Sequence, residues 1–247
     1  MTNNDWRIWD RNDAVEQRTY ERVTGKLPEM ECAKQLTSLV REIYQSSMRI
    51  LDVGCAAGHY YNSLKNIDSQ ILYTGFDSTK AYIDFAKNHF DEENVNFEIQ
   101  DVFNIDSHHR DAFDVVFCCN VLLHLPSIIN PIENLLSSTK KYCLIRTLVS
   151  DKTHLSKYLY SDSFDSDGRP DNFVYENTYS FKYIEDLIMN HGNYTIEFID
   201  DKFDSSAINQ EFMNYDSIQD AVTKSVNGVQ IAGSKVFEWK WIKVVIK

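Results

Sequence analysis

Short apolar runs alternate with amphipathic segments over residues 49–149, and this rhythm constrains the fold of the 247-residue chain more than any other feature of its sequence. Each apolar run has the length of a strand, and a loop and a segment with helical character follow it. Parallel neighbouring strands need such helical crossovers, so the rhythm predicts a mostly parallel sheet with helices on both faces. The predicted strands are residues 49–53, 71–76, 95–99, 113–119 and 141–149, and the predicted crossover helices are residues 59–66, 80–89 and 126–140.

Two regions of different character flank this rhythm. Apolar residues recur at helical spacing over residues 29–46, and we expect residues 1–46 to form an N-terminal helical cap on a main domain of residues 47–247. Residues 150–178 are rich in Ser, Asp and Tyr and have no clear period. We interpret this stretch as a lid inserted over a pocket.

The C-terminal part adds further elements. A helix at 180–191 and strands at 194–200 and 234–247 are predicted, whereas residues 204–230 have no firm pattern beyond partial helical character. Two late strands after five alternating units predict an antiparallel hairpin at the sheet edge. The fold class is therefore α/β: a Rossmann-like, seven-stranded, mostly parallel sheet with helices on both faces and an antiparallel C-terminal hairpin strand.

The charge of the chain disfavours polyanionic partners. It has 37 acidic against 25 basic residues, a formal net charge of −12, and no basic run longer than Lys140–Lys141. A nucleic-acid-binding protein needs a cationic surface to neutralise phosphates. We therefore expect no nucleic acid and no membrane among its partners, while homo-oligomerisation is left open.

The five cysteines indicate a reducing compartment. Their number is odd, three of them lie in apolar runs, and none forms a C-x-x-C pair. We expect buried free thiols in a cytoplasmic protein and no metal site. The N-terminus has no apolar signal segment, and no stretch approaches the length of a membrane span.

The most informative motif is the segment LDVGCAAG at residues 51–58. It leads from a buried strand through a loop of small residues into a helix. Gly54 and Gly58 allow backbone angles closed to other residues and let a ligand lie directly against the main chain. The dinucleotide fingerprint G-x-G-x-x-G would require glycine at positions 56 and 59, where this chain has Ala56 and His59.

This segment resembles motif I of the class I S-adenosylmethionine-dependent methyltransferases, Asp/Glu-x-Gly-x-Gly-x-Gly. The resemblance covers about residues 30–150, and Ala56 stands where the family has its middle glycine. It implies S-adenosylmethionine as the cofactor, S-adenosylhomocysteine as the product and methyl transfer as the reaction. The cofactor-binding residues that it implies in this loop are Asp52, Gly54, Cys55, Ala56 and Gly58.

The ends of the next three strands carry further candidate cofactor residues. Asp77, with Ser78 beside it, suits a ribose diol, because a carboxylate accepts two hydrogen bonds. The resemblance implies that Asp101 and Val102 meet the adenine, with Phe103 flanking the ring, and that Asn120 contacts the methionine part. The alternatives are an N-terminal helix cap at Asp77 and a plain turn at Asp101.

Catalysis and acceptor binding are less constrained. His124 is a candidate general base, because imidazole titrates near neutral pH. The alternative that the resemblance implies is a structural histidine that closes the start of the following helix. Candidate acceptor-pocket residues are Trp9, Tyr20, His124, Arg146 and Tyr158, with Arg146 a partner for an acceptor carboxylate or phosphate.

Three functions remain open at this point. The leading one is methyl transfer to an oxygen, nitrogen or carbon atom of a small molecule. The others are a catalytically silent S-adenosylmethionine-binding partner subunit and a protein methyltransferase. The last is disfavoured because Asn120 is followed by Val-Leu-Leu instead of the Pro-Pro-Tyr/Phe that marks glutamine or adenine amino acceptors in this family.

Overall fold

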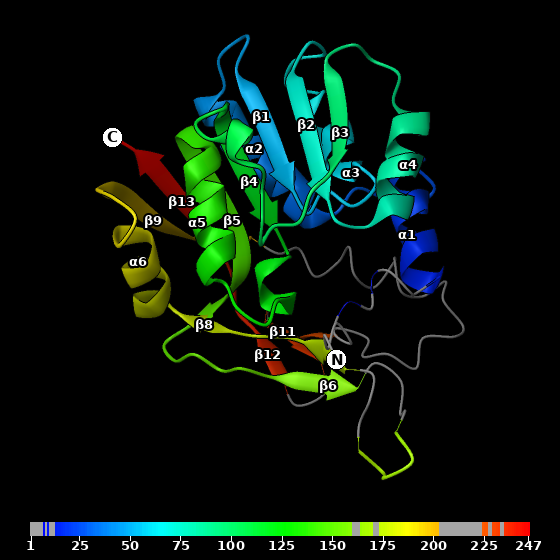
Figure 1. The fold of residues 1–247 in the computed structure, drawn as a ribbon, viewed down its shortest axis with the longest axis vertical. Helices are drawn as coiled ribbons and strands as arrows, with labels where there is room; N and C mark the ends of the chain where they lie inside the picture. The colour runs from blue at the N-terminus through cyan, green and yellow to red at the C-terminus, as the bar shows by residue number, and fades with distance from the viewer. Residues whose placement is uncertain are drawn as a thin grey trace.

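The computed structural model describes residues 7, 9, 13–159, 164–169, 173–202, 224–226, 229–232 and 235–247. Its centre is a sheet with the path β3-β2-β1-β4-β5-β13-β9, to which the short β8 adds beside β5 (Figure 1). The five parallel strands are β1 (Arg49–Val53), β2 (Leu72–Asp77), β3 (Val95–Ile99), β4 (Phe113–Cys119) and β5 (Thr139–Ser150). The predicted mostly parallel, Rossmann-like sheet is confirmed.

The strand order reverses between β1 and β4. From β1 the chain proceeds outward through β2 to β3, and it then returns to the other side of β1 for β4 and β5. In an open α/β sheet the crevice beyond the carboxyl ends of the strands at such a reversal is where ligands bind. The topology therefore places a binding site beyond Val53 and Cys119, the last residues of β1 and β4.

Helices cover both faces of the sheet. One face packs against α2 (Glu31–Ile43), α3 (His59–Leu64) and α4 (Lys80–His89), and the last residue of α1 (Asp13–Val23) is buried in the same cluster. The other face packs against α5 (Ile129–Ser138) and α6 (Phe181–Met189). Figure 1 shows α5 and α6 in front of the sheet and α2 behind it. Helix α2 shares its core with the sheet. The division into a cap of residues 1–46 and a main domain stays a prediction.

Strand β4 shows why the apolar runs are almost continuous. Val115 and Phe117 lie in the cluster under α2 and α3, while Val116 and Cys118 lie in the cluster under α5 and α6. A strand with helices on both faces buries both sets of alternating side chains, so a mixed polar pattern would be costly there.

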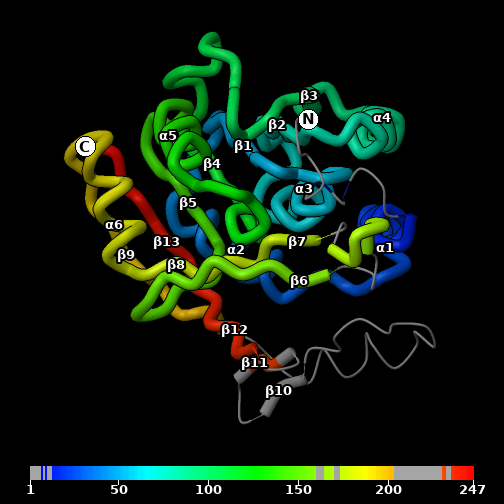
Figure 2. Tube along the Cα trace, turned by 60° about the horizontal axis from the view of Figure 1, so that its bottom comes forward, coloured from blue at the N-terminus to red at the C-terminus, as the bar shows by residue number. Residues whose placement is uncertain are grey.

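The region predicted to be a lid contains regular structure. Strands β6 (Lys157–Leu159) and β7 (Phe173–Tyr175) pair antiparallel, and β8 (Tyr179–Ser180) joins the end of β5. Figure 1 shows β6 and β8 below the carboxyl ends of the parallel strands, and Figure 2 shows β6 beside β7. This position is compatible with a lid, which stays a prediction.

The C-terminal elements differ from expectation in two ways. The single strand predicted at 234–247 is divided at Glu238 into β12 (Lys235–Phe237) and β13 (Trp239–Ile246). Strand β13 lies between β5 and β9 (Tyr194–Asp200), antiparallel to both, so β9 forms the edge. Instead of helix, the end of the uncertain region contains β10 (Lys224–Val226) and β11 (Val229–Ala232), which form a meander with β12. Residues 203–223 lie outside the described part.

The described helices are short and amphipathic. Among them none combines the length and the apolar character that crossing a membrane requires.

Candidate functional site

A cavity of about 310 Å³ opens at the carboxyl ends of the parallel strands, at the reversal of strand order. Its wall combines the loops after β1, β2, β3 and β4 with side chains of α1 and the 3-10 turn Leu122–His124. The predicted residues that line it are Trp9, Gly54, Ala56, Asp77, Ser78, Asp101, Val102, Asn120 and His124.

The loop after β1 is held in an unusual backbone conformation. Gly54, Ala56 and Gly58 have φ angles of 80°, 47° and 87°, in the left-handed region. A Cβ at Gly54 would lie 2.3 Å from Cγ2 of Val121, and one at Gly58 would lie 2.7 Å from the ring of Phe97. Both glycines are therefore required by conformation and by packing, and Gly58 serves the packing of the loop against β3 instead of lining the cavity.

Asp77 connects this loop to β2. Its Oδ2 accepts the Ala56 N–H at 2.9 Å, and its Oδ1 accepts the Thr79 N–H at 2.8 Å. Each oxygen is thus oriented by a backbone donor, and a carboxylate oxygen can accept more than one hydrogen bond. Ser78 lies beside it in the wall of the cavity.

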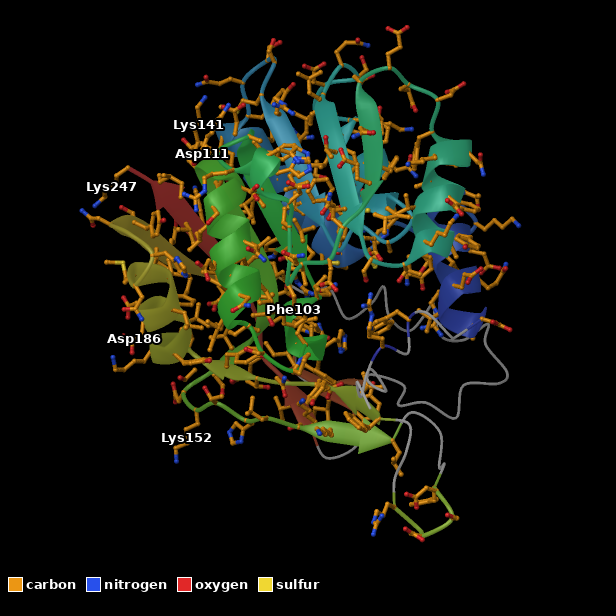
Figure 3. The ribbon with its side chains drawn as sticks, viewed as in Figure 1. Phe103, Asp111, Lys141, Lys152, Asp186 and Lys247 are labelled. Atoms are coloured by element: carbon orange, nitrogen blue, oxygen red, sulfur yellow. The ribbon has the colours of Figure 1, made fainter. Side chains whose placement is uncertain are left out.

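Asp101 and Val102 form the neighbouring part of the wall. Asp101 Oδ1 accepts the Phe103 N–H at 2.9 Å, and Oδ2 lies 3.5 Å from Nη1 of Arg7. The Val102 carbonyl accepts a hydrogen bond from Asn134 of α5 at 2.8 Å, which fixes the loop. Phe103 does not line the cavity; it packs against the apolar cluster under α5, and Figure 3 shows it near the lower end of that helix.

Asn120 follows β4 with φ at 61°, a left-handed conformation that asparagine tolerates better than most residues. Its N–H donates to the Arg146 carbonyl at 3.0 Å, and its Oδ1 accepts from the Arg146 guanidinium. The arrangement holds an amide side chain in the cavity wall where β4 ends.

Arg146, a predicted partner of the acceptor, lies away from the cavity wall. Its side chain is buried, and Nε and Nη2 each lie 3.0 Å from a carboxylate oxygen of Asp201. The guanidinium also lies 4.1 Å from the ring centroid of Trp239. Arg146 does not line the cavity, and its role here is to orient Asn120.

Comparisons with known proteins agree with this geometry. A family model described as a methyltransferase domain matches residues 44–165, which include the loop after β1 and the ends of β2, β3 and β4. Residues 44–165 therefore carry a methyltransferase domain, and the chain has the fold of S-adenosylmethionine-dependent methyltransferases.

Curated relatives of this methyltransferase chain carry two kinds of name. It is 30% identical to the ubiquinone biosynthesis O-methyltransferase of Coxiella burnetii over 102 residues, which cover 40% of this chain and 42% of that protein. It is 34% identical to the tRNA U34 carboxymethyltransferase of Helicobacter hepaticus over 102 residues, which cover 37% of this chain and 31% of that protein. The matched part thus spans less than half the length of either relative.

Solved structures match over nearly the whole chain. Phosphoethanolamine N-methyltransferase 2 of Haemonchus contortus, in complex with S-adenosyl-L-methionine, gives a TM-score of 0.63 at 15% identity over 98% of this chain and 60% of that chain. Magnesium protoporphyrin IX methyltransferase of Synechocystis gives 0.56 at 13% identity over 99% and 98%. At such identities the likeness establishes the fold.

Two predicted residues of the methyltransferase motif lie beneath the loop instead of in the cavity wall. Asp52 is fully buried and accepts a hydrogen bond of 2.6 Å from the Tyr73 hydroxyl. Burial raises the pKa of Asp52 well above its usual range. Cys55 is also fully buried. The two side chains support the loop from below and are not exposed to a ligand.

His124 combines several constraints at the opposite wall. Its Nδ1 lies 2.8 Å from the Tyr175 carbonyl, so Nδ1 carries the proton and Nε2 keeps a lone pair. The ring of Trp9 lies edge-on at 4.8 Å between centroids. Burial lowers the pKa of His124 to about 4, so the ring is neutral at physiological pH. A neutral imidazole with one free lone pair can accept a proton.

Two further residues predicted for the acceptor pocket, Tyr20 and Tyr158, lie outside the cavity wall. Tyr20 stacks on Phe85 at 3.9 Å, and its hydroxyl reaches the Ala81 carbonyl at 3.4 Å, so it joins α1 to α4. Tyr158 on β6 is 45% exposed and does not line the cavity. Aromatic composition alone did not distinguish rings that pack or face solvent from rings that face a ligand.

Several residues of the wall were not singled out from the sequence. His59 follows the motif glycine directly, and within the described part of the chain neither of its ring nitrogens has a hydrogen-bond partner. Burial lowers the pKa of His59 to about 3, and the charge of Arg22 contributes. Position in the motif is the signal that could have identified His59. Other such residues are Arg22, Met30, Tyr60, Tyr82 and Gln100.

Proposed function

We propose that this chain binds S-adenosylmethionine in the cavity and transfers its methyl group to a small-molecule acceptor. The observation that carries the proposal is the convergence of Gly54, Asp77, Asp101 and Asn120, from the ends of four strands, on one cavity that also contains His124. A cavity of about 310 Å³ has the size of a small-ligand site.

The lining residues fit the three parts of the cofactor. Asp77, with both oxygens oriented by backbone donors, would hold the ribose diol, and Ser78 lies beside it. Asp101 and Val102 would hold the adenine. The methionine part would lie along the loop and strand end formed by the residues Gly54, Ala56 and Asn120.

The buried polar atoms of the wall support a polar ligand. The two ring nitrogens of His59 are buried without a partner among the described residues, which costs free energy unless a ligand supplies one. Arg22 of α1 is the cationic side chain beside His59 in the lining. We propose that Arg22 takes the cofactor carboxylate.

The protein contributes alignment and proton removal. When bound, S-adenosylmethionine supplies a methyl group already activated by a positive sulfur. Much of the remaining rate enhancement comes from holding two reactants in line. His124, fixed by the Tyr175 carbonyl and packed by Trp9, would accept the proton of an acceptor hydroxyl or amine at Nε2. This geometry favours an oxygen or nitrogen acceptor over carbon.

Charge favours a small molecule over tRNA. One curated relative acts in ubiquinone biosynthesis and another on tRNA U34 by their names, so relatedness alone does not decide. The net charge of −12 and the isoelectric point near 5.0 oppose binding to a polyphosphate. An oxygen acceptor on a small molecule is our leading assignment.

Two measurements test the proposal. Calorimetry should show one equivalent of S-adenosylhomocysteine bound, with an increase in melting temperature. Transfer of radiolabelled methyl from S-adenosylmethionine should then be assayed with phenols, carboxylic acids, amines and bulk tRNA. Label in any small acceptor but not in tRNA supports the proposal. Absence of S-adenosylhomocysteine binding at millimolar concentration would refute its first half, and label in tRNA alone would refute its second half.

The second candidate function is a silent cofactor-binding role, and one structural neighbour motivates it. The 4+2 cyclase SpnF has the same fold, with a TM-score of 0.63 at 14% identity over 99% of this chain and 96% of that chain. The fold therefore also occurs in a protein whose name is not that of a methyltransferase. If S-adenosylhomocysteine binds but no acceptor takes label, a silent cofactor-binding role for this chain is supported instead.

A further inference from the structure

A cluster of potential metal ligands lies outside the cavity, where β3 meets the connection to β4. Glu98 of β3 and the adjacent His108 and His109 of the 3-10 turn Ser107–His109 each place one ligand atom within 4.8 Å of the others. None of the three lines the cavity. The sequence alone predicts no metal site, because the topology is needed to bring the turn back to the strand.

The pair of Glu98 and His109 already has the spacing of two ligands on one ion. Glu98 Oε2 lies 3.3 Å from Nε2 of His109. Two ligand atoms bound to zinc at about 2.0–2.2 Å in a tetrahedral arrangement lie about 3.4 Å apart. The same distance also fits a weak ion pair, so geometry must decide between the two.

The hydrogen-bond geometry of His109 favours a shared ligand. The side chain of His109 is only 8% exposed, and its Nε2 is buried without a hydrogen bond, although the carboxylate is near. The ring packs against Phe76 and Phe113, which fixes its orientation. A buried nitrogen that lies 3.3 Å from a carboxylate oxygen without a good hydrogen bond to it is compatible with a third atom bound by both.

Neighbouring side chains orient two of the three ligands. The Nδ1 of His108 lies 2.8 Å from Asp106 Oδ1, and Glu98 Oε1 accepts a hydrogen bond from Asn96 at 2.7 Å. Carboxylate–histidine contacts of this kind set the tautomer and orientation of metal-bound imidazoles. The His108 ring is 62% exposed, so an ion from solvent can reach the site.

We propose that Glu98, His108 and His109 bind a divalent transition metal ion of the zinc class. Two imidazole nitrogens and one carboxylate oxygen suit Zn²⁺, Co²⁺ or Ni²⁺ better than Mg²⁺ or Ca²⁺, which prefer all-oxygen sites. The ion would join β3 to the chain that follows Asp101 and Val102. In Figure 3, Phe103 lies near the lower end of α5 and Asp111 lies near the upper end of that helix. Metal binding would therefore restrain the connection that carries two lining residues of the cavity.

Titration of the tag-free full chain with ZnCl₂ and with CoCl₂ tests the site. Calorimetry should show one equivalent of Zn²⁺, insensitive to millimolar Mg²⁺, and bound Co²⁺ should give the visible absorption of a low-coordinate nitrogen–oxygen site. His108→Gln and Glu98→Gln should each weaken Zn²⁺ affinity by at least about 10-fold, and Asp106→Asn by about 10-fold.

The control is His191→Gln, which removes an exposed histidine elsewhere and should leave Zn²⁺ affinity unchanged. Circular dichroism and melting temperature of each variant establish that it is folded. Zn²⁺ affinity that is equal in wild type, His108→Gln and Glu98→Gln would overturn the proposal, as would the absence of a saturable equivalent. Neither readout depends on methyl transfer, so the metal site and the proposed function fail or succeed separately.

Discussion

At the scale of single residues, His124 is the side chain whose replacement separates binding from chemistry. His124→Gln keeps an amide donor for the Tyr175 carbonyl but removes the basic nitrogen. Loss of a general base typically costs about 10²–10⁴-fold in rate, so we expect kcat to fall by at least about 100-fold. Turnover with the active acceptor and calorimetry with S-adenosylhomocysteine measure the two effects. An unchanged kcat would assign His124 a structural role.

The lowered pKa values of His59 and His124 also predict a pH dependence of stability. Burial lowers the pKa of His124 to about 4 and that of His59 to about 3, from the ordinary 6.5. The unfolded chain therefore binds more protons than the folded one below pH 6.5, and stability falls as the pH decreases. Between pH 7 and pH 5 each histidine should cost about 2 kcal/mol of unfolding free energy.

Urea unfolding at pH 7 and pH 5 measures this loss. The double variant His59→Gln/His124→Gln should lose less stability over this interval than wild type, whereas His191→Gln, which changes an exposed histidine, should follow wild type. An equal loss in wild type and in the double variant would show that other groups dominate the pH dependence.

Ala56 is a position at which a substitution should increase the stability of the chain. It has φ at 47°, where a side chain costs roughly 1–2 kcal/mol relative to glycine. Ala56→Gly should therefore stabilise the chain, by up to about 1 kcal/mol after the extra freedom of glycine in the unfolded state is counted. Urea unfolding tests this. The matched control is Ala57→Gly, at a fully buried position without positive φ, which should destabilise. Destabilisation by both would mean that the Ala56 methyl contributes more by packing than it costs in strain.

At the scale of elements, one asparagine attaches the predicted lid to the turn that carries His124. The Asn177 N–H donates to the Leu123 carbonyl at 2.8 Å, and its Nδ2 donates to the Leu125 carbonyl at 2.9 Å. Its Oδ1 accepts the Ser156 N–H at 3.0 Å. The backbone and the buried side chain of Asn177 together connect the approach to β6, the end of β7 and both flanks of His124.

Asn177→Ala should leave buried donors and acceptors unpaired, at a cost of about 2–3 kcal/mol in unfolding free energy. It should also lower kcat more than it lowers affinity for S-adenosylhomocysteine, because His124 loses the fixed position of the Tyr175 carbonyl. Urea unfolding and steady-state kinetics measure both effects. Asn190→Ala, at an exposed position after α6, is the control and should stay within about 0.5 kcal/mol of wild type. A variant as stable and active as wild type would exclude this anchoring role.

The elements also show how far sequence reasoning extends. The bounds of α4, β3, β4 and β9 agree with prediction because periodicity and capping are local properties of the chain. The hairpin of β6 and β7 was missed because each strand has three residues and its partner lies more than ten positions away. The division of the last strand at Glu238 depends on β12 pairing with β11, which no local pattern reveals.

The same distinction applies to the site. Asp77, Asp101 and Asn120 follow predicted strands, and parallel topology brings strand ends together, so their placement in one wall was predictable. The position of Arg146 outside the wall was not predictable from local sequence, because its carboxylate partner, Asp201, is 55 positions away. His59 was not predicted, because only the folded structure shows that its ring nitrogens are buried without a hydrogen-bond partner among the described residues.

At the scale of the whole molecule, the net charge disfavours tRNA as the methyl acceptor. The formal net charge of −12 repels polyphosphates at long range, and the release of counterions that drives nucleic-acid binding needs clustered cations. Arg7, a cation of the cavity wall, is already paired with Asp101 at 3.5 Å. We therefore expect no tRNA binding tighter than the weak end of nonspecific affinity, about 10⁻⁴ M, at physiological salt.

Fluorescence anisotropy with labelled bulk tRNA at 50 and 150 mM salt tests this expectation, with a tRNA methyltransferase as the positive control. An acidic chain should show weak binding at both salt concentrations. Micromolar affinity at 50 mM salt that falls steeply at 150 mM would instead reveal a local basic surface strong enough to overcome the net charge. It would move the acceptor toward the tRNA-directed relatives, while leaving the assignment of the cofactor cavity intact, because that cavity is built from strand ends and does not depend on surface charge.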